Sequence, residues 1–351
     1  MSFERILIIR PSALGDVCRS VPVLTSLRRA FPNARIDWLV QTEFADAVRA
    51  HPDLSNVVPF ARRDLSLSRL HQPGMRRRML ELVRSVREPG YDLVVDCQGL
   101  ARSGLLTRLT RAKERVGHAD AREMAWAAYT KRVPPGPSQH TVDRMLDLVR
   151  AVGVEPVMDM RLYAPSDAAS GLPEDLLESS PIVIAPTSRW PGKRWPIERF
   201  AEIARWLLAH SDRPIAIVGA GSEREQCGPL LEVAANHPRG IDLIGATSIG
   251  GLMQLISKSS LVIANDSAAL HMAVGYDKPI VALFGPTDTA KVGPYRRDEC
   301  VLQHAGSLDG ISHKDDDAGL QLMQRITPEE VIERLESLLG SAAPVISEEQ
   351  T

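Results

Sequence analysis

The chain of 351 residues is 44% hydrophobic and 25% charged, and it is about twice as long as the ~150-residue unit that one core usually serves. Its 42 Lys and Arg nearly balance 44 Asp and Glu, which argues against a protein that binds nucleic acid by coating it with cations. The four cysteines lie far apart without a C-x-x-C pair, so the pattern excludes a disulfide scaffold and a zinc knuckle, and reduced thiols in the cytoplasm fit best.

Short β-branched runs alternate with longer amphipathic stretches, a pattern typical of the strands and crossover helices of a parallel sheet. In the first half, four runs predict strands, at 5–10, 36–40, 56–60 and 92–96. The segment after Gly15 predicts the first helix, whose apolar face carries Val17, Val21, Leu24 and Leu27. This order predicts a doubly wound α/β domain.

A Pro, Gly and Ser cluster at 134–138 precedes one more amphipathic helix, near 140–152, and the polar stretch 164–180 then dilutes the apolar pattern. We place the domain boundary there, with a first domain at 1–165 and a second at 166–325. In the second domain we expect strands at 181–186, 214–219, 241–245, 261–266 and 279–285. We expect its helices near 197–210, 223–235 and 248–257 and from Ser267, then a C-terminal helix in 326–340 and a flexible tail in 341–351.

Neither half carries the G-x-G-x-x-G or P-loop fingerprint, so candidate sites come from polar residues beyond the carboxyl ends of strands. Asp16 follows the first strand, at the first turn of a helix. It is either a helix cap favoured by the dipole or a base that faces a cleft between the domains. Asp96 also ends a strand, and there we favour a structural carboxylate.

In the second domain, the strand at 181–186 ends in Thr187 and Ser188, and Lys193 follows. Hydroxyls and an ammonium suit a phosphate leaving group, and the alternative is a solvated basic turn. Asp266 ends another strand, and Ser267 and His271 then lie one helical turn apart, either as site residues or as ordinary cap and core groups. A further strand ends in the turn 284–288.

No His pair or carboxylate cluster has the spacing of metal ligands, so we expect no metal and no cofactor. Residues 60–90 hold eight arginines, among them Arg62 and Arg63, against three acidic residues, a net charge of +5 with His71 neutral. This run is either a soluble helix face or a patch for anionic lipid headgroups or a phosphorylated acceptor.

These motifs in this order resemble the glycosyltransferase family 9 heptosyltransferases of lipopolysaccharide core assembly over nearly all of 4–340. The first half, with SALGDV, VPVLTSLRRAFP and GYDLVVDCQGLARSGLLTRL, is most similar to the heptosyltransferase I branch. The second half, with GKRWP, NDSAALH and PIVALFGPTD, is at least as similar to the heptosyltransferase II branch. The resemblance implies a GT-B fold, in which two Rossmann-like domains with parallel sheets face each other across an interdomain cleft.

The resemblance also implies roles for individual residues. Asp16 matches the catalytic base of an inverting, metal-independent transfer from ADP-heptose to a glycolipid acceptor. The donor-binding positions, all in the second domain, are Thr187, Ser188, Lys193, Glu223, Asp266, Ser267 and His271. The acceptor-binding positions, in the first domain, are Arg62, Arg63 and Arg122. Ala268 departs from the family pattern, because a glycine usually stands there, and this leaves the identity of the sugar open.

The sequence also predicts where the protein works. MSFERILIIR is no Sec signal, and no stretch approaches the ~20 apolar residues of a membrane-spanning helix. We therefore expect a cytoplasmic protein, peripherally associated with the inner membrane, that binds a nucleotide sugar and an anionic glycolipid but no nucleic acid. Two alternatives stay open: a nucleotide-sugar 2-epimerase on the same fold, and a non-catalytic nucleotide-sugar-binding protein.

Overall fold

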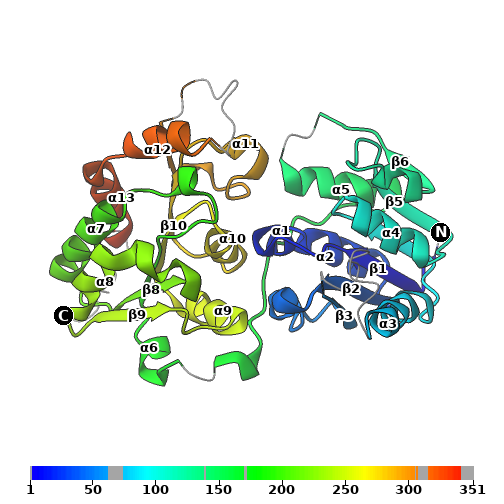
Figure 1. The fold of residues 1–351 in the computed structure, drawn as a ribbon, viewed down its shortest axis with the longest axis horizontal. Coiled ribbons are helices and arrows are strands. Elements are labelled where there is room, and N and C mark those ends of the chain that lie inside the picture. The colour runs from blue at the N-terminus through cyan, green and yellow to red at the C-terminus, as the bar shows by residue number, and fades with distance from the viewer. Residues whose placement is uncertain are drawn as a thin grey trace, which may run out of the picture.

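The structure, a computed structural model, describes residues 2–61, 74–137, 140–169, 172–304, 306 and 315–340. It contains two α/β domains that lie side by side, each built on a six-stranded sheet (Figure 1). The strand pairs of both sheets are parallel, as the alternating pattern predicts. The predicted tail in 341–351 falls outside the described residues.

The first sheet has the order β3-β2-β1-β4-β5-β6. Its strands are β1 (Arg5–Ile9), β2 (Arg35–Gln41), β3 (Asn56–Phe60), β4 (Leu93–Asp96), β5 (Glu114–His118) and β6 (Lys131–Val133). The four predicted strands are confirmed. The sequence analysis missed β5 and the edge strand β6, because both are short, rich in charged residues and not fully buried, so they lack an apolar run.

Helices α1 (Leu14–Arg19) and α2 (Val21–Ala30) replace the single helix predicted after Gly15. Pro22 has no N–H to donate to the preceding turn, so the first helix ends at Arg19 and a second begins. The predicted apolar face is nevertheless fully buried. The remaining helices of this domain are α3 (Met75–Arg87), α4 (Ala101–Leu109) and α5 (Thr141–Ala151).

The second sheet has the order β12-β11-β10-β7-β8-β9. Its strands are β7 (Ile182–Ala185), β8 (Ile215–Gly219), β9 (Gly240–Ile244), β10 (Leu261–Asn265), β11 (Ile280–Phe284) and β12 (Val301–Gln303). The five predicted strands are confirmed, and the central strands β7, β10 and β11 are buried along their whole length. The sequence analysis missed the short edge strand β12, which is only partly buried.

The prediction of one helix over 223–235 is wrong in its first half. A 3-10 turn covers Gly221–Cys227, and a regular helix starts only at Gly228, where Pro229 can occupy the first turn without an N–H. The helices of this domain are α6 (Glu174–Glu178), α7 (Ile197–His210), α8 (Gly228–Ala235), α9 (Ile249–Lys258), α10 (Ala268–Gly275), α11 (Thr289–Val292), α12 (Asp316–Gln324) and α13 (Pro328–Gly340). In the described part of the chain, no helix is long and apolar enough to cross a membrane.

The two domains touch through α1 and α10, which lie next to each other at the centre of Figure 1. Hydrogen bonds reinforce this contact nearby. Arg19 Nη1 donates to the Val292 carbonyl at 2.9 Å, and His140 Nε2 lies 3.1 Å from the Gly293 carbonyl. Because α1 follows β1 and α10 follows β10, the carboxyl ends of the two central strands meet at this interface.

Candidate active site

Asp16 lies in the first turn of α1, where its carboxylate both caps the helix and pairs with two arginines. Its Oδ2 accepts a hydrogen bond from the Ala13 N–H at 3.3 Å, so the carboxylate caps its own helix. The same oxygen lies 2.9 Å from Arg10 Nη2, and Oδ1 accepts a hydrogen bond from Arg19 Nη2. The side chain keeps 26% of its surface exposed, so a substrate hydroxyl can reach it.

The two arginines determine the charge of Asp16. Burial raises the pKa of this carboxyl, but the charges of Arg10 and Arg19 outweigh burial and lower the pKa to about 2. The carboxylate is therefore ionised at neutral pH and free to accept a proton, although the same cations make it a weak base.

Across the interface, Asp266 is the centre of a second cluster. Lys193 Nζ lies 2.6 Å from Asp266 Oδ2, and Thr287 Oγ1 donates to the same oxygen at 2.9 Å. Burial raises the pKa of Asp266, but the charge and hydrogen bond of Lys193, together with His271 and the Thr287 hydroxyl, outweigh burial and lower it. The Ser188 hydroxyl donates to the Asp266 backbone carbonyl at 3.1 Å, which ties the loop after β7 to the end of β10.

Three other predicted donor residues follow the carboxyl ends of strands in the same sheet. Thr187 is buried beside Gly219, where an added Cβ would lie 3.2 Å from Thr187 Oγ1. Glu223 follows β8 and accepts a hydrogen bond from the Ala220 N–H at 2.8 Å, so it closes its own turn. Ser267 stands at the N-cap of α10, yet its buried hydroxyl has no partner among the described residues.

His271 connects the two clusters. A Cβ added to Gly15 would lie 2.8 Å from His271 Cδ2 and 3.6 Å from Ala268 Cα, so only glycine lets α1 approach α10 this closely. Burial, followed by the charge of Arg19, lowers the pKa of His271 to about 3. The imidazole is therefore neutral at physiological pH, and it lies close enough to sense the charges of both Asp16 and Asp266.

The predicted acceptor residues are less well defined. Arg122 is exposed in the loop after β5, at the carboxyl end of the first sheet, which faces the second domain. Arg62 and Arg63 fall outside the described residues.

Asp96 is buried and accepts hydrogen bonds from Tyr129 Oη and the Gln98 N–H, which matches the structural role favoured from the sequence.

Among the described residues, no three His, Cys, Asp or Glu side chains lie together as a metal-ligand set.

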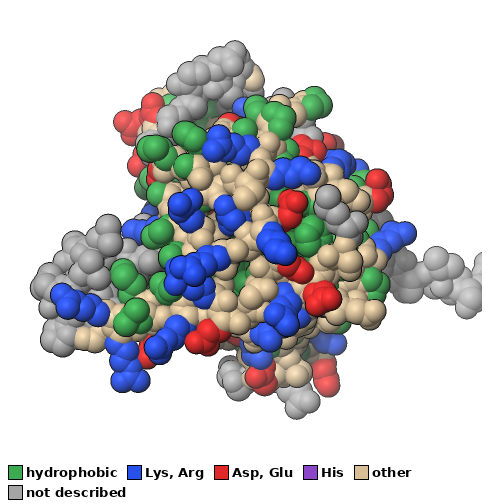
Figure 2. Space-filling model, turned by 90° about the vertical axis from the view of Figure 1, so that its right-hand side faces the viewer, with side chains coloured by type: hydrophobic (Ala, Val, Ile, Leu, Met, Phe, Trp, Pro, Cys, Tyr) green, Lys and Arg blue, Asp and Glu red, His purple; other side chains and the backbone are tan. Residues whose placement is uncertain are grey.

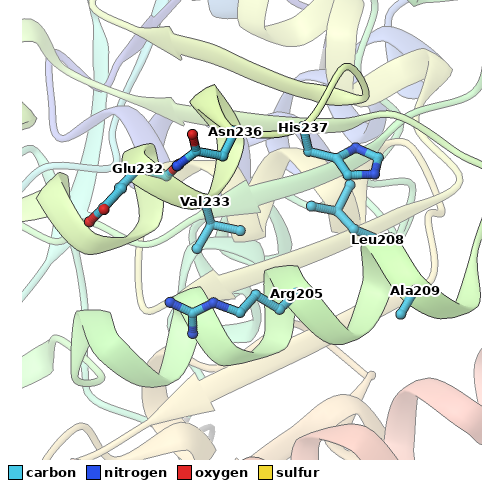
Figure 3. A pocket seen from close by; sticks show the side chains of 7 residues that line it. All are labelled: Arg205, Leu208, Ala209, Glu232, Val233, Asn236 and His237. Carbon is cyan, nitrogen blue, oxygen red and sulfur yellow. The ribbon is translucent and has the colours of Figure 1, made fainter.

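A pocket of about 450 Å³ lies between α7 and the end of α8, on the second domain (Figure 3). None of the residues discussed above lines it; those that do are Arg205, Leu208, Ala209, Glu232, Val233, Asn236 and His237.

Sequence reasoning missed three residues of the site: Arg10, Arg19 and Thr287. Each had a local signal. An arginine that directly follows a buried strand and an arginine three residues after Asp16 both suggest partners for that carboxylate. Thr287 lies in the 284–288 turn, which by itself was equally consistent with no function.

Arg19→Gln tests the coupling between this arginine and Asp16. A carboxyl whose pKa is lowered by folding stabilises the protein above its ordinary pKa of 3.8, and this contribution is lost as the pH falls toward 2. Removing Arg19 brings the pKa of Asp16 closer to 3.8, so the free energy of unfolding should depend less on pH in this window. At pH 7 we expect a loss of about 1–3 kcal/mol, typical of a charged hydrogen bond.

The matched control is Arg150→Gln, which removes an exposed arginine from another i, i+3 pair, with Asp147. It should change stability by less than about 0.5 kcal/mol. Denaturant unfolding of both variants between pH 2 and pH 7 measures the difference. Equal pH dependence of Arg19→Gln and wild type would contradict the proposed coupling.

Comparisons with known proteins show which family this chain resembles. A family model described as glycosyltransferase family 9 (heptosyltransferase) matches residues 79–314. Lipopolysaccharide heptosyltransferase 1 of Pseudomonas aeruginosa is 32% identical over 312 residues, which cover 85% of this chain and 83% of that protein.

Solved structures show the same fold. Escherichia coli ADP-heptose lipopolysaccharide heptosyltransferase II has a TM-score of 0.75 at 22% identity, covering 97% of this chain and 100% of that chain. An E. coli heptosyltransferase with ADP-2-deoxy-2-fluoro heptose has a TM-score of 0.73 at 22% identity, covering 95% and 99% of the two chains. The expected GT-B fold is confirmed.

Proposed function

This chain belongs to glycosyltransferase family 9, the heptosyltransferase family, and we propose that it transfers a heptose from ADP-heptose to a lipopolysaccharide inner-core acceptor. The observation that carries the proposal is the juxtaposition of Asp16, from the first domain, with the Lys193–Asp266–Thr287 cluster of the second. A base and a diphosphate-binding cluster on opposite sides of one interface are what a sugar transfer between two bound substrates requires.

The second domain, 166–325, is the donor domain in this proposal. One solved heptosyltransferase of the same fold is described as a structure with ADP-2-deoxy-2-fluoro heptose, an analogue of ADP-heptose, and this supports the choice of donor. Lys193 and the hydroxyls of Thr187 and Ser188 would bind the diphosphate, whose charge grows as its bond to the sugar breaks. Asp266, Ser267 and His271 would contact the sugar, and Glu223 the ribose. Helix α13 packs against α7 of this domain and extends it.

The first domain, 1–165, is the acceptor domain, with Arg122, Arg62 and Arg63 toward the anionic groups of the glycolipid. The acceptor oxygen attacks the anomeric carbon on the face opposite the diphosphate, so the configuration inverts. The bond from the anomeric carbon to the phosphate oxygen breaks, and its electron pair leaves with ADP. Asp16 takes the hydroxyl proton. Arg10 and Arg19 keep this carboxylate ionised and oriented.

The direct test is a thermal-shift panel of nucleotide sugars followed by product analysis. A ligand at 100 times its dissociation constant adds ~2.7 kcal/mol to stability, which a melting curve detects. We expect ADP-heptose to give the largest shift and to be consumed only when a glycolipid acceptor is present. Turnover of the donor alone would indicate an epimerase, and binding without turnover would indicate a non-catalytic protein.

Metal independence is a second expectation, because Lys193 and the two hydroxyls would supply the charge that a divalent ion gives to diphosphate in other transferases. Transfer in excess EDTA should therefore run at the rate of the untreated control. Strong inhibition by EDTA that magnesium or manganese reverses would refute this part of the proposal.

We also propose that the protein works in the cytoplasm, at the inner-membrane surface, with α3 toward the lipid. Arg76 and Arg78 are exposed, whereas Arg77 pairs with Glu81 at 2.8 Å. Each basic residue near an anionic surface contributes ~1 kcal/mol to binding, and the effect decays within ~8 Å at physiological salt.

Neutralising Arg76, Arg77 and Arg78 together should weaken sedimentation with anionic vesicles and raise KM for a lipid acceptor. Unchanged sedimentation and kinetics would make this face an ordinary solvated surface.

A further inference from the structure

A second basic site lies at the opposite end of the first domain from the interface. Four arginines and two leucines line a pocket of about 520 Å³, called here the four-arginine pocket: Arg87, Leu105, Arg108, Leu109, Arg111 and Arg115. Helices α3 and α4 contribute their C-terminal ends, and the last two arginines lie just before and within the start of β5.

The topology separates this pocket from the cleft. Strand β5 runs parallel to β4, and β4 runs parallel to β1, so the start of β5 lies at the amino end of the sheet. Asp16 follows the carboxyl end of β1. Figure 2 views the first domain from the end that faces away from the second domain, and Lys and Arg side chains outnumber acidic ones there.

Backbone carbonyls hold two of the pocket's arginines in place, but no described carboxylate neutralises the charge of any of the four. Arg87 Nε donates to the Leu109 carbonyl at 3.1 Å, and Arg115 Nε donates to the Ala128 carbonyl at 2.9 Å. Arg108 and Arg111 are exposed. Within the described part of the chain, none of the four guanidinium groups forms an ion pair with a carboxylate.

Helix capping explains only part of this arrangement. The carbonyls at the end of α4 attract cations, and Arg87 binds one of them. Arg108 and Arg111 add two more positive charges that no described carboxylate balances. Burial lowers the pKa of Arg115 most, and the charge of Arg108 lowers it further, so these two guanidinium groups repel each other. An anion with several oxygens would relieve this repulsion, and guanidinium forks match phosphate oxygens in geometry.

We propose that the four-arginine pocket binds a phosphate or diphosphate group, carried by a soluble molecule or by a lipid headgroup, at a site separate from the cleft. Arg87 and Arg115, fixed by backbone carbonyls, would form the preorganised part of the site, and Arg108 and Arg111 would close over the anion. Leu105, which is 47% exposed, lies at the rim and would contact the apolar part of the ligand.

The first experiment titrates inorganic pyrophosphate by calorimetry into the full chain carrying Lys193→Ala, so that the cleft lacks the ammonium proposed to bind diphosphate. Arg108→Gln/Arg111→Gln should weaken pyrophosphate binding by at least about tenfold, since it removes two charged contacts. The matched control is Arg29→Gln/Lys258→Gln, which removes the same charge from two exposed residues and should bind as wild type does. Lys193→Ala without further changes should still bind pyrophosphate through the pocket, and it is the reference for both double variants.

The second experiment distinguishes the two sources of phosphate by sedimentation with phosphatidylcholine vesicles, with and without phosphatidylglycerol. Loss of anionic-vesicle binding in Arg108→Gln/Arg111→Gln but not in the control assigns the pocket to a lipid headgroup. Loss of pyrophosphate binding alone assigns it to a soluble ligand. Transfer to a detergent-solubilised acceptor should stay at the wild-type rate. If the variant binds both pyrophosphate and vesicles as wild type does, the proposal is wrong.

Discussion

Asp16→Asn should lower the rate of sugar transfer by about 10²–10⁴-fold while leaving donor binding nearly unchanged. Asparagine keeps the size of the side chain and an oxygen for the Ala13 N–H, so the start of α1 can form. It cannot take up the proton of the acceptor hydroxyl. The measurement is single-turnover transfer beside calorimetric binding of the donor.

The low pKa of Asp16 limits how this residue can serve as the proposed base. With a pKa of about 2 it cannot deprotonate a free sugar hydroxyl in advance. As the new bond to the anomeric carbon forms, the attacking oxygen becomes an oxonium, a strong acid that gives its proton even to a weak base. Proton transfer therefore follows bond formation. We expect kcat/KM to show no acidic limb from Asp16 above pH 4.

Asp16→Asn also leaves two buried arginines without their anion, so a loss of stability must be separated from a loss of chemistry. Melting temperatures of the variant measure the first effect. Asp143→Asn serves as the matched control, because Asp143 accepts a hydrogen bond from Tyr295 Oη at 2.6 Å across the same interface. That variant should keep transfer within a few-fold of wild type. A near-wild-type rate in Asp16→Asn would remove this residue from the mechanism.

The sequence predicts the parts of the fold and site that depend on local pattern. Buried strands are continuous apolar runs, and Asp16, Thr187, Ser188 and Asp266 stand out because each follows such a run. Edge strands such as β6 escape prediction, because their pattern is half polar. The resemblance to a family supplies what local pattern does not, namely that two domains face each other.

The features that the sequence could not predict are the contacts between segments far apart along the chain. Arg19 bonds to Val292 in the other domain, and Gly15 lies against His271. No periodicity indicates such pairs, because each is fixed by how the finished domains pack. Thr287 is similar: its turn becomes part of the site only because β11 pairs with β10 and brings its hydroxyl to Asp266.

Lys193→Ala should lower turnover by about 10²–10³-fold, the typical cost of removing one preorganised contact to a charge that develops in the transition state. Without donor, the ammonium is neutralised by Asp266, which lies 2.6 Å away. In the proposed mechanism, the bound diphosphate competes with Asp266 for this ammonium, and its attraction to the ammonium grows as the bond to the sugar breaks. The effect on kcat should therefore exceed the effect on donor affinity.

The kinetics of Lys193→Ala must be separated from a loss of stability. The variant leaves the Asp266 carboxylate without its cation, although the Asp266 side chain is only 12% exposed. Removing one partner of a buried pair destabilises a protein strongly. The double variant Lys193→Met/Asp266→Asn removes both charges and should recover much of the melting temperature. If its turnover stays well below that of Asp266→Asn alone, the loss lies in the missing ammonium. If affinity alone falls in Lys193→Ala, then Lys193 binds the diphosphate equally in the ground and transition states and does not assist its departure.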